Sequence, residues 1–359
     1  MSWKNDITQH LNIEYPIIQA PMFGVTSPEM VAATNAAGCL GSLALGDLSA
    51  EQCTELIRTT RKLTDKPFAA NIFVNNIPSL TEELTIRYNS IRSFIERLAS
   101  DHSLPIKIPD IKTYSLTDYR DQITALIAEN CKIVSFTFGN LDNESIERLK
   151  ENGIRLIGTC TSVREALLLE KSGIDIICVQ GLEAGGHRGS FDQDNIPKIG
   201  GLALLPQVRD AVHIPVVYAG GISNAKILNA TKSLGAQGFQ IGSMLLCAPE
   251  SNLLDFEKEA LKNITEEDIV LTKAFSGRYA KGINNAFIEA LHSTEILPYP
   301  YQNKLTATLR NEAKKHKNKD FVSIWVGNSL PHYSHSSTTI LLNNLIQDTE
   351  EIFNQMSKP

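Results

Sequence analysis

The sequence lacks the features that mark a disulfide scaffold, a metal centre, a membrane span or a nucleic-acid-binding protein. Its 359 residues contain six cysteines and no C-x-x-C pair, so neither a disulfide framework nor a metal site is expected. No apolar run approaches the ~18 residues that a membrane span needs. The net charge is −6, with 34 basic and 40 acidic side chains, and there is no basic stripe of the kind that binds nucleic acid. What remains is an ordinary globular composition with a large core.

The surroundings of the cysteines and the first nine residues indicate the cellular compartment of the protein. Residues 1–9 include Lys4 and Asp6 and have no apolar centre, so they do not resemble a signal peptide. Most cysteines stand in apolar runs, as Cys178 does, and are expected to be buried and reduced. These features predict a cytoplasmic protein and leave a homodimer open.

Eight short apolar segments rich in β-branched residues predict strands. They are residues 16–22, 39–45, 68–74, 132–138, 155–159, 175–180, 215–219 and 238–242. Near-continuous apolar runs are typical of parallel strands that are covered on both faces. Helix-start signals such as Ser27-Pro28-Glu29, Ser49 and Ser162 stand between them. This alternation favours an α/β fold of the (β/α)8 TIM-barrel type, with an open doubly wound sheet as the alternative.

Two stretches exceed what a barrel needs. Residues 75–130 are too long for one crossover and predict a helical insertion, so the barrel with its insertion spans residues 1–250. Residues 251–320 are polar and helix-prone, and they predict a smaller helix-rich domain that covers the substrate cavity. Their closing basic run is typical of a solvated helix face. Residues 321–359 are expected to return to the barrel and to end in a packing helix.

Polar residues end several predicted strands, where barrels build their active sites. Asn71, Thr159 and Gln180 offer neutral donors and acceptors among apolar neighbours, an arrangement that suits a flat heterocycle with imide edges such as a flavin. Glycines without side chains follow the last two predicted strands at 220, 221 and 242, beside Ser243. Backbone N–H groups there can approach a phosphate, although tight turns explain such glycines as well.

The loop after the sixth predicted strand reads Gln180-Gly-Leu-Glu-Ala-Gly-Gly-His-Arg-Gly189. Its four glycines predict a pliable loop that passes close to a cofactor and presents His187 and Arg188. Histidine is the side chain best suited to proton transfer near neutral pH. The alternative is a solvent-exposed His-Arg pair on a glycine turn.

These segments resemble the nitronate monooxygenases, a family of FMN-dependent TIM-barrel enzymes. The resemblance is carried by Pro16-Ile-Ile-Gln-Ala-Pro-Met22, Glu183-Ala-Gly-Gly-His-Arg-Gly189, Tyr218-Ala-Gly-Gly-Ile222 and Gly235-Ala-Gln-Gly-Phe-Gln-Ile-Gly242. The class I members are indicated by Ser135-Phe-Thr-Phe-Gly139, Phe275-Ser-Gly-Arg278 and Tyr299-Pro-Tyr-Gln-Asn303. The Ala-Gly-Gly-His motif is shared with the flavin-dependent enoyl-ACP reductases, so by itself it indicates only the superfamily.

The resemblance implies a role for each matching residue. His187 matches the catalytic histidine of the family. Contacts to FMN are implied for Pro21, Met22, Asn71, Gln180, Gly185, Gly220, Gly221, Gln240, Ile241, Gly242 and Ser243. A substrate cavity is implied at Tyr299, Tyr301 and Lys304, and Arg188 would add positive charge. The chain departs from the family at Trp325-Val-Gly-Asn-Ser-Leu330, which leaves the cavity wall and the substrate range open.

The implied activity is oxidative denitrification of a small anionic nitronate, with propionate 3-nitronate as the family's usual substrate. Dioxygen is the second substrate, and the products are a carbonyl compound and nitrite. An NAD(P)H-dependent FMN reductase of enoyl thioesters or quinones is the nearest alternative, although no strand is followed by G-x-G-x-x-G. A non-redox barrel that binds a phosphate ligand is a further alternative.

Overall fold

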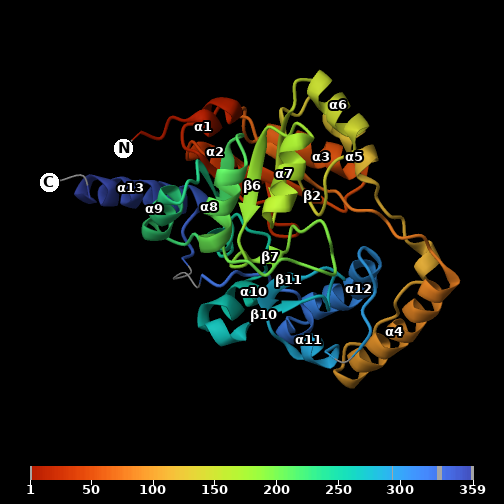
Figure 1. Ribbon diagram of the computed structural model, residues 1–359. Coiled ribbons are helices and arrows are strands. Elements are labelled where there is room, and N and C mark those ends of the chain that lie inside the picture. Colours follow the sequence, from red (N-terminus) through yellow and green to blue (C-terminus); the bar gives the residue numbers. More distant parts are fainter. Residues whose placement is uncertain (1, 293, 330–333, 357–359) are drawn as a thin grey trace.

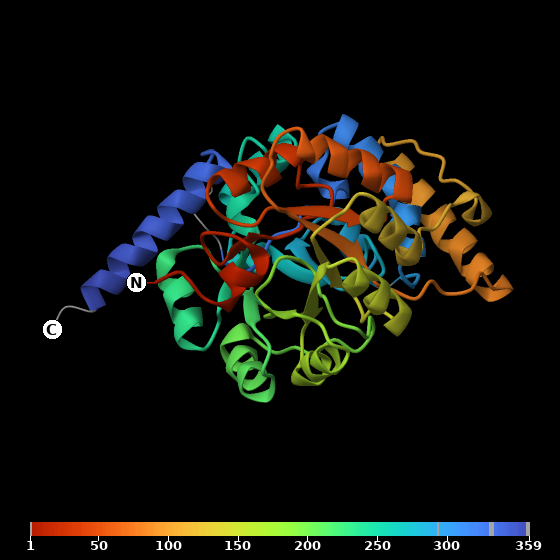
Figure 2. The ribbon, with the colours of Figure 1, turned by 90° about the horizontal axis from the view of Figure 1, so that it is seen from above.

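Eight parallel strands form a barrel in the computed structural model, which describes residues 2–292, 294–329 and 334–356 (Figures 1 and 2). The barrel strands are β1 (Ile17–Gln19), β2 (Ser42–Gly46), β3 (Ala69–Phe73), β4 (Ile133–Thr137), β5 (Arg155–Cys160), β6 (Ile176–Gln180), β8 (Val216–Ala219) and β9 (Gly238–Ile241). They pair in the order β1-β9-β8-β6-β5-β4-β3-β2. A bridge between Ile18 and Leu40 joins the two ends of this order, so the predicted (β/α)8 barrel is confirmed.

Helices alternate with these strands and form the outer layer of the barrel (Figure 2). They are α2 (Pro28–Ala36), α3 (Ala50–Arg61), α5 (Tyr119–Ala128), α6 (Asn143–Glu151), α7 (Val163–Lys171), α8 (Gly201–Ala211) and α9 (Ala225–Ser233). The predicted starts hold: Ser27, Ser49 and Ser162 each accept a hydrogen bond from the N–H three residues on. Such caps satisfy donors that a helix leaves unpaired.

The inside of the barrel is an apolar core that α1 (Asp6–Leu11) closes at one end. Ile7 and Leu11 of this helix are buried with side chains such as Ile133 and Val217 that point into the barrel. Ile7 lies against the beginning of β9, since a Cβ on Gly238 would meet its side chain at 3.2 Å. The amino-terminal end of the barrel is therefore filled, and only the carboxyl end is free to hold a ligand.

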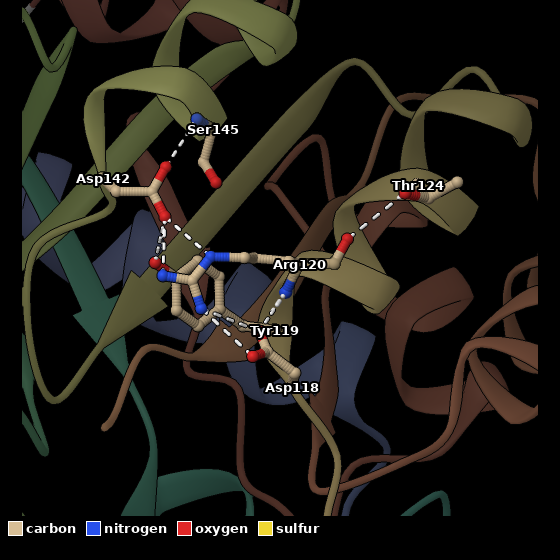
Figure 3. A network of polar contacts seen from close by, with 6 residues as sticks. All are labelled: Asp118, Tyr119, Arg120, Thr124, Asp142 and Ser145. Atoms are coloured by element: carbon tan, nitrogen blue, oxygen red, sulfur yellow. Dashed lines mark hydrogen bonds and ion pairs between the residues drawn. The ribbon is translucent and has the colours of Figure 1, made fainter. Parts of the chain in front are cut away.

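A polar network fastens α5 to α6 on the outside of the barrel (Figure 3). Asp142 caps α6 by accepting from the Ser145 N–H at 2.8 Å, and it accepts from the Tyr119 hydroxyl at 2.7 Å and from Arg120 Nε at 2.9 Å. Partial burial acts to raise the pKa of Asp142, but the hydrogen bonds from Ser145 and Tyr119 and the charge of Arg120 outweigh it and lower the pKa to about 2. The carboxylate is therefore ionised at neutral pH and holds the two helices in register.

A second apolar core lies beside the barrel and defines what we call the smaller lobe (Figure 1). The lobe consists of α4 (Glu82–Asp101), η1 (Ile111–Thr113), α10 (Asp255–Ala260), η3 (Leu261–Asn263), η4 (Glu266–Asp268), β10 (Ile269–Thr272), β11 (Ala280–Ile283), α11 (Ala286–Ala290), α12 (Tyr301–Lys315) and η5 (Lys319–Phe321). Its strands form a small antiparallel sheet with β7 (Gly186–His187). The sequence pattern predicted helices for this region and missed that sheet.

The predicted insertion at residues 75–130 separates into two parts. Only α4 and the segment around η1 pack into the smaller lobe, where α4 lies against α12. In contrast, α5 is an ordinary barrel helix that contacts α3, α6 and β3. The division of the chain at residue 250 stays a prediction.

The last helix, α13 (Thr338–Met356), packs along α2 and α9 of the barrel (Figure 2). Leu342, Leu345 and Ile346 join the barrel core, and Trp3 Nε1 donates to Glu350 at 2.8 Å. All six cysteines are buried and free, as predicted. Among the described residues, no helix combines the length and the apolarity that a bilayer crossing requires.

Candidate active site

A cavity of about 380 Å³ lies at the carboxyl ends of the barrel strands, between the barrel and the smaller lobe. Its barrel side includes Asn71 of β3, Ser135 of β4 and Gln180 of β6. Its other side is formed by Phe275, Ser276, Tyr299, Asn303, Arg310, Asn311, Lys314, Ser323 and Trp325. The smaller lobe thus covers the only end of the barrel that α1 leaves free.

Most of the residues singled out in the sequence meet in this cavity, although their roles stay predictions. Those that line it are Pro21, Met22, Asn71, Gln180, Gly185, His187, Gly220, Gly221, Gln240, Gly242, Ser243 and Tyr299. Ile241 of β9, which was also predicted to contact FMN, does not line the cavity, because successive side chains of a strand point to opposite faces. Gln240 faces the cavity, so Ile241 faces outward, into the apolar layer between the strands and the helices, and is 0% exposed.

Helix geometry explains why two predicted cavity residues of α12 do not line it. The cavity face of α12 carries Asn303, Arg310 and Lys314, which repeat at about seven and four residues and so share one face. The Tyr301 hydroxyl points elsewhere and donates to the Pro78 carbonyl at 2.8 Å. Lys304 is also outside the lining, and its carbonyl accepts from the Tyr114 hydroxyl at 3.3 Å.

The glycine-rich loop is fixed rather than pliable, because Gln180 and the small sheet hold both of its ends. The Gln180 side chain donates to the His187 carbonyl at 3.0 Å and accepts from the Gly189 N–H at 2.9 Å. His187 itself pairs with Ala280 of β11. Arg188 points away from the cavity, is 1% exposed and donates to the Gly181 carbonyl at 2.6 Å. The alternative of a solvent-exposed His-Arg pair is therefore wrong, and so is a substrate contact by Arg188.

His187 is held in one tautomer by Ser276. The Ser276 hydroxyl donates its only proton to the Arg278 carbonyl at 3.1 Å, because a carbonyl can only accept. In this assignment Ser276 Oγ accepts at 2.8 Å from His187 Nε2, because one hydroxyl proton cannot serve two acceptors. Proton and tautomer are assigned from this network. Among the described residues Nδ1 has no hydrogen-bond partner, so its lone pair is available in the cavity.

The surroundings of His187 keep the imidazole neutral. Its ring lies 5.5 Å from the Trp325 ring and 5.6 Å from the Phe138 ring, between centroids. Burial lowers the pKa of His187, and the positive charges of Arg278 and Arg310 lower it further, from 6.5 to about 3. At neutral pH this side chain can accept a proton or a hydrogen bond, but it does not supply a positive charge.

Another part of the cavity wall is a glycine turn that follows β8. Gly220 has φ +136° and Gly221 has φ +68°, values that side chains disfavour. A Cβ on Gly220 would lie 3.3 Å from the Ala184 nitrogen, so the backbone itself forms this wall. Ser243, next to the turn, accepts from the Gly327 N–H at 3.0 Å and keeps its own proton to donate.

Gly185 is required for a reason that the sequence did not show. A Cβ there would lie 2.5 Å from the Gly327 nitrogen, so the absence of a side chain lets residues 325–327 pack against the loop. This segment, where the chain departs from the family pattern, places Trp325 beside His187. It is thus part of the cavity wall up to Ser329, while Leu330 lies outside the described residues.

The charged side chains that line the cavity are cations. Within the described part of the chain they are Arg310 and Lys314, and no aspartate or glutamate lines the cavity. Lys314 pairs with the buried Glu257 at 3.1 Å. The sequence reasoning missed Arg310, whose only signal is a position seven residues after Asn303 on one helix face.

A closed (β/α)8 barrel with a covered cavity and a neutral histidine defines the molecule as a TIM-barrel enzyme with a proton-accepting group in its site. Comparison with known proteins narrows this class. The sequence model of the nitronate monooxygenase family matches residues 4–348. A relative from Staphylococcus aureus (strain JH9), named "Probable nitronate monooxygenase", is 39% identical over 353 residues, which are 97% of this chain and 98% of the relative. The chain therefore belongs to the nitronate monooxygenase family and is an oxidoreductase.

Solved structures agree with this assignment. The nitroalkane oxidase from Streptomyces ansochromogenes is 32% identical, with a TM-score of 0.88 over 98% of this chain and 100% of that chain. FabK from Thermotoga maritima has a TM-score of 0.76 at 23% identity, over 98% of both chains. At that identity the second likeness shows a shared fold alone.

Proposed function

We propose that this protein binds FMN in the cavity and oxidises alkyl nitronates with dioxygen to a carbonyl compound and nitrite, with propionate 3-nitronate as substrate. One observation carries the proposal: a neutral His187 faces a cavity whose charged lining residues are cations among the described residues. Such a site attracts an anion and can also accept a proton. Family membership supports the reaction class.

The residues present fit a flavin mononucleotide. Gly220 and Gly221 line the cavity in a positive-φ turn, where backbone N–H groups would hold a phosphate, and Ser243 adds a hydroxyl donor. Asn71 donates to Ser135 at 2.9 Å, which leaves its carbonyl oxygen as an acceptor for an imide N–H. When bound, the flavin supplies the electron transfer between nitronate and dioxygen.

The protein's own contribution is to bind, orient and shield the substrate. The cationic lining of the cavity attracts an anionic substrate, and the rings of Phe138, Tyr299 and Trp325 exclude water from the space beside His187. An anion next to Arg310 offsets the charge that lowers the pKa of His187, so binding strengthens this base. With a neutral nitroalkane, His187 Nδ1 is the atom that takes the proton, while Ser276 holds Nε2–H.

Anaerobic mixing tests the proposal. The purified protein should carry a flavin absorption band that bleaches with propionate 3-nitronate and not with NADH, and in air the nitronate should yield nitrite. Bleaching by NADH alone, with no nitrite from the nitronate, would instead support an NAD(P)H-dependent reductase. A colourless protein that takes up no FMN would support the non-redox phosphate-ligand barrel.

A further inference from the structure

Arg310 of α12 lines the cavity and forms no ion pair with any residue that the structure describes. Its Nη2 donates to the carbonyl oxygen of Asn303 at 2.9 Å and to Asn303 Oδ1 at 2.8 Å. Its Nε is buried and has no hydrogen-bond partner among the described residues. A buried charge without a counter-ion is unfavourable. An anion in the cavity would therefore complete the surroundings of this guanidinium.

The carboxylates near Arg310 are already occupied by other groups. Asp47 accepts from the Tyr299 hydroxyl and from Asn303 Nδ2, the latter at 2.8 Å. It raises the pKa of Arg310, which burial lowers to about 10, but it reaches the guanidinium only through Asn303. Glu257 pairs with Lys314 at 3.1 Å. Neither carboxylate forms an ion pair with Arg310.

Arg310 lies on the opposite side of the barrel from the glycine turn. Asn303, which accepts from Arg310, donates to Asp47, and Asp47 also accepts from the Tyr299 hydroxyl. The Tyr299 ring lies 6.3 Å from the Phe73 ring and 5.7 Å from the Phe138 ring, between centroids. These two rings stand at the ends of β3 and β4. The glycine turn follows β8, which in the ring of eight strands is four places from β3 and three places from β4. The anion at Arg310 is therefore not the phosphate that the glycine turn would hold.

We propose that Arg310 binds a carboxylate at the far end of the substrate, so that the enzyme selects nitronates carrying a second anionic group over simple alkyl nitronates, whose only charge is on the nitronate group. The assignment of the nitronate rests on the proposed function, whereas the carboxylate site rests on Arg310 alone. A guanidinium is well suited to this task because it stays charged and donates several hydrogen bonds to a carboxylate. Asn303 positions the guanidinium by accepting from Nη2.

The test compares Arg310→Gln with a matched control on the same helix, Lys315→Gln, whose side chain is exposed. Each variant is assayed with propionate 3-nitronate and with propyl 1-nitronate, a monoanion that has the nitronate group but no carboxylate. Loss of a charge-assisted hydrogen bond should lower kcat/KM of Arg310→Gln for the carboxylated substrate by about 10- to 100-fold. The kcat/KM for propyl 1-nitronate, which has no carboxylate, should change by less than about twofold, and Lys315→Gln should alter neither value.

A titration separates this proposal from the proposed function. Calorimetry should show that the wild-type protein binds 3-nitropropionate more tightly than 1-nitropropane, and that Arg310→Gln removes the difference. This result would stand even if the protein turned over no nitronate, in which case only the proposed function would fail. Equal losses with both nitronates would overturn the carboxylate site. A loss of FMN from Arg310→Gln would overturn it too, because the anion would then be the cofactor phosphate.

Discussion

Replacing His187 with asparagine should change how the stability of the protein depends on pH. In the folded protein, burial and the charges of Arg278 and Arg310 lower the pKa of His187 from 6.5 to about 3. The unfolded chain binds a proton near pH 6.5, whereas the folded protein does not until about pH 3. Between these values the unfolded state holds more protons, so stability is fully present above 6.5 and falls as the pH is lowered.

The size of this loss of stability follows from the interval between the unfolded and the folded pKa of His187. Each pH unit contributes about 1.4 kcal/mol, so His187 should lower the free energy of unfolding by about 2 kcal/mol between pH 6.5 and about pH 5. Urea unfolding at a series of pH values measures this slope for the wild-type protein and for His187→Asn.

The histidine variant should lack that contribution, and its curve should be flatter over this interval. His213→Asn is the control, because it removes an exposed histidine outside the cavity and should keep the wild-type slope. Identical slopes for the wild-type protein and His187→Asn would refute the reasoning that places a neutral, shielded imidazole in the cavity.

Three further predictions test the site. His187→Asn should lower turnover of a neutral nitroalkane by at least ~10²-fold while retaining FMN, and unchanged turnover would remove the proton-accepting role. Ser276→Ala should lower turnover of the neutral nitroalkane by about 2- to 10-fold with little effect on a nitronate, since one hydrogen bond to His187 is lost. Ser276→Thr keeps the hydroxyl and should restore activity. Nitrogen NMR of His187 shows which ring nitrogen carries the proton, and an unaltered Nε2–H in Ser276→Ala would contradict the tautomer assignment. Gly221→Ala should destabilise the fold by about 1–2 kcal/mol through its positive φ and should also lower the FMN content. Gly153→Ala is the control, because Gly153 has a similar φ and open space around it. Equal loss of FMN in both variants would exclude a role of the Gly221 turn in binding FMN.

The barrel could be predicted because each of its strands carries a local signal. Segments such as Ile176-Ile-Cys-Val179 are apolar throughout, and the serines at 27, 49 and 162 mark helix starts. The small sheet had no such signal. Residues 269–272 are short and only half-buried over most of their length, and β7 is a two-residue strand that exists through its pairing with β11.

Site residues could be predicted from the sequence where a motif follows a strand. They could not be predicted where a residue reaches the cavity only through the packing of distant segments. His187 and the glycines at 220 and 221 follow strands and line the cavity. Arg310 reaches the cavity because α12 packs across the barrel end, which no local pattern encodes. Gly185 stands out in the sequence, but its closest neighbour is Gly327, more than a hundred residues further along the chain. Tertiary packing decides both positions.

Stopped-flow mixing of the purified protein with propionate 3-nitronate in the absence of oxygen tests the central claim most directly. The account predicts that the flavin absorption band bleaches within the time of one turnover, and that adding air restores the band as nitrite forms. A flavin that stays oxidised with the nitronate but bleaches with NADH would contradict the account.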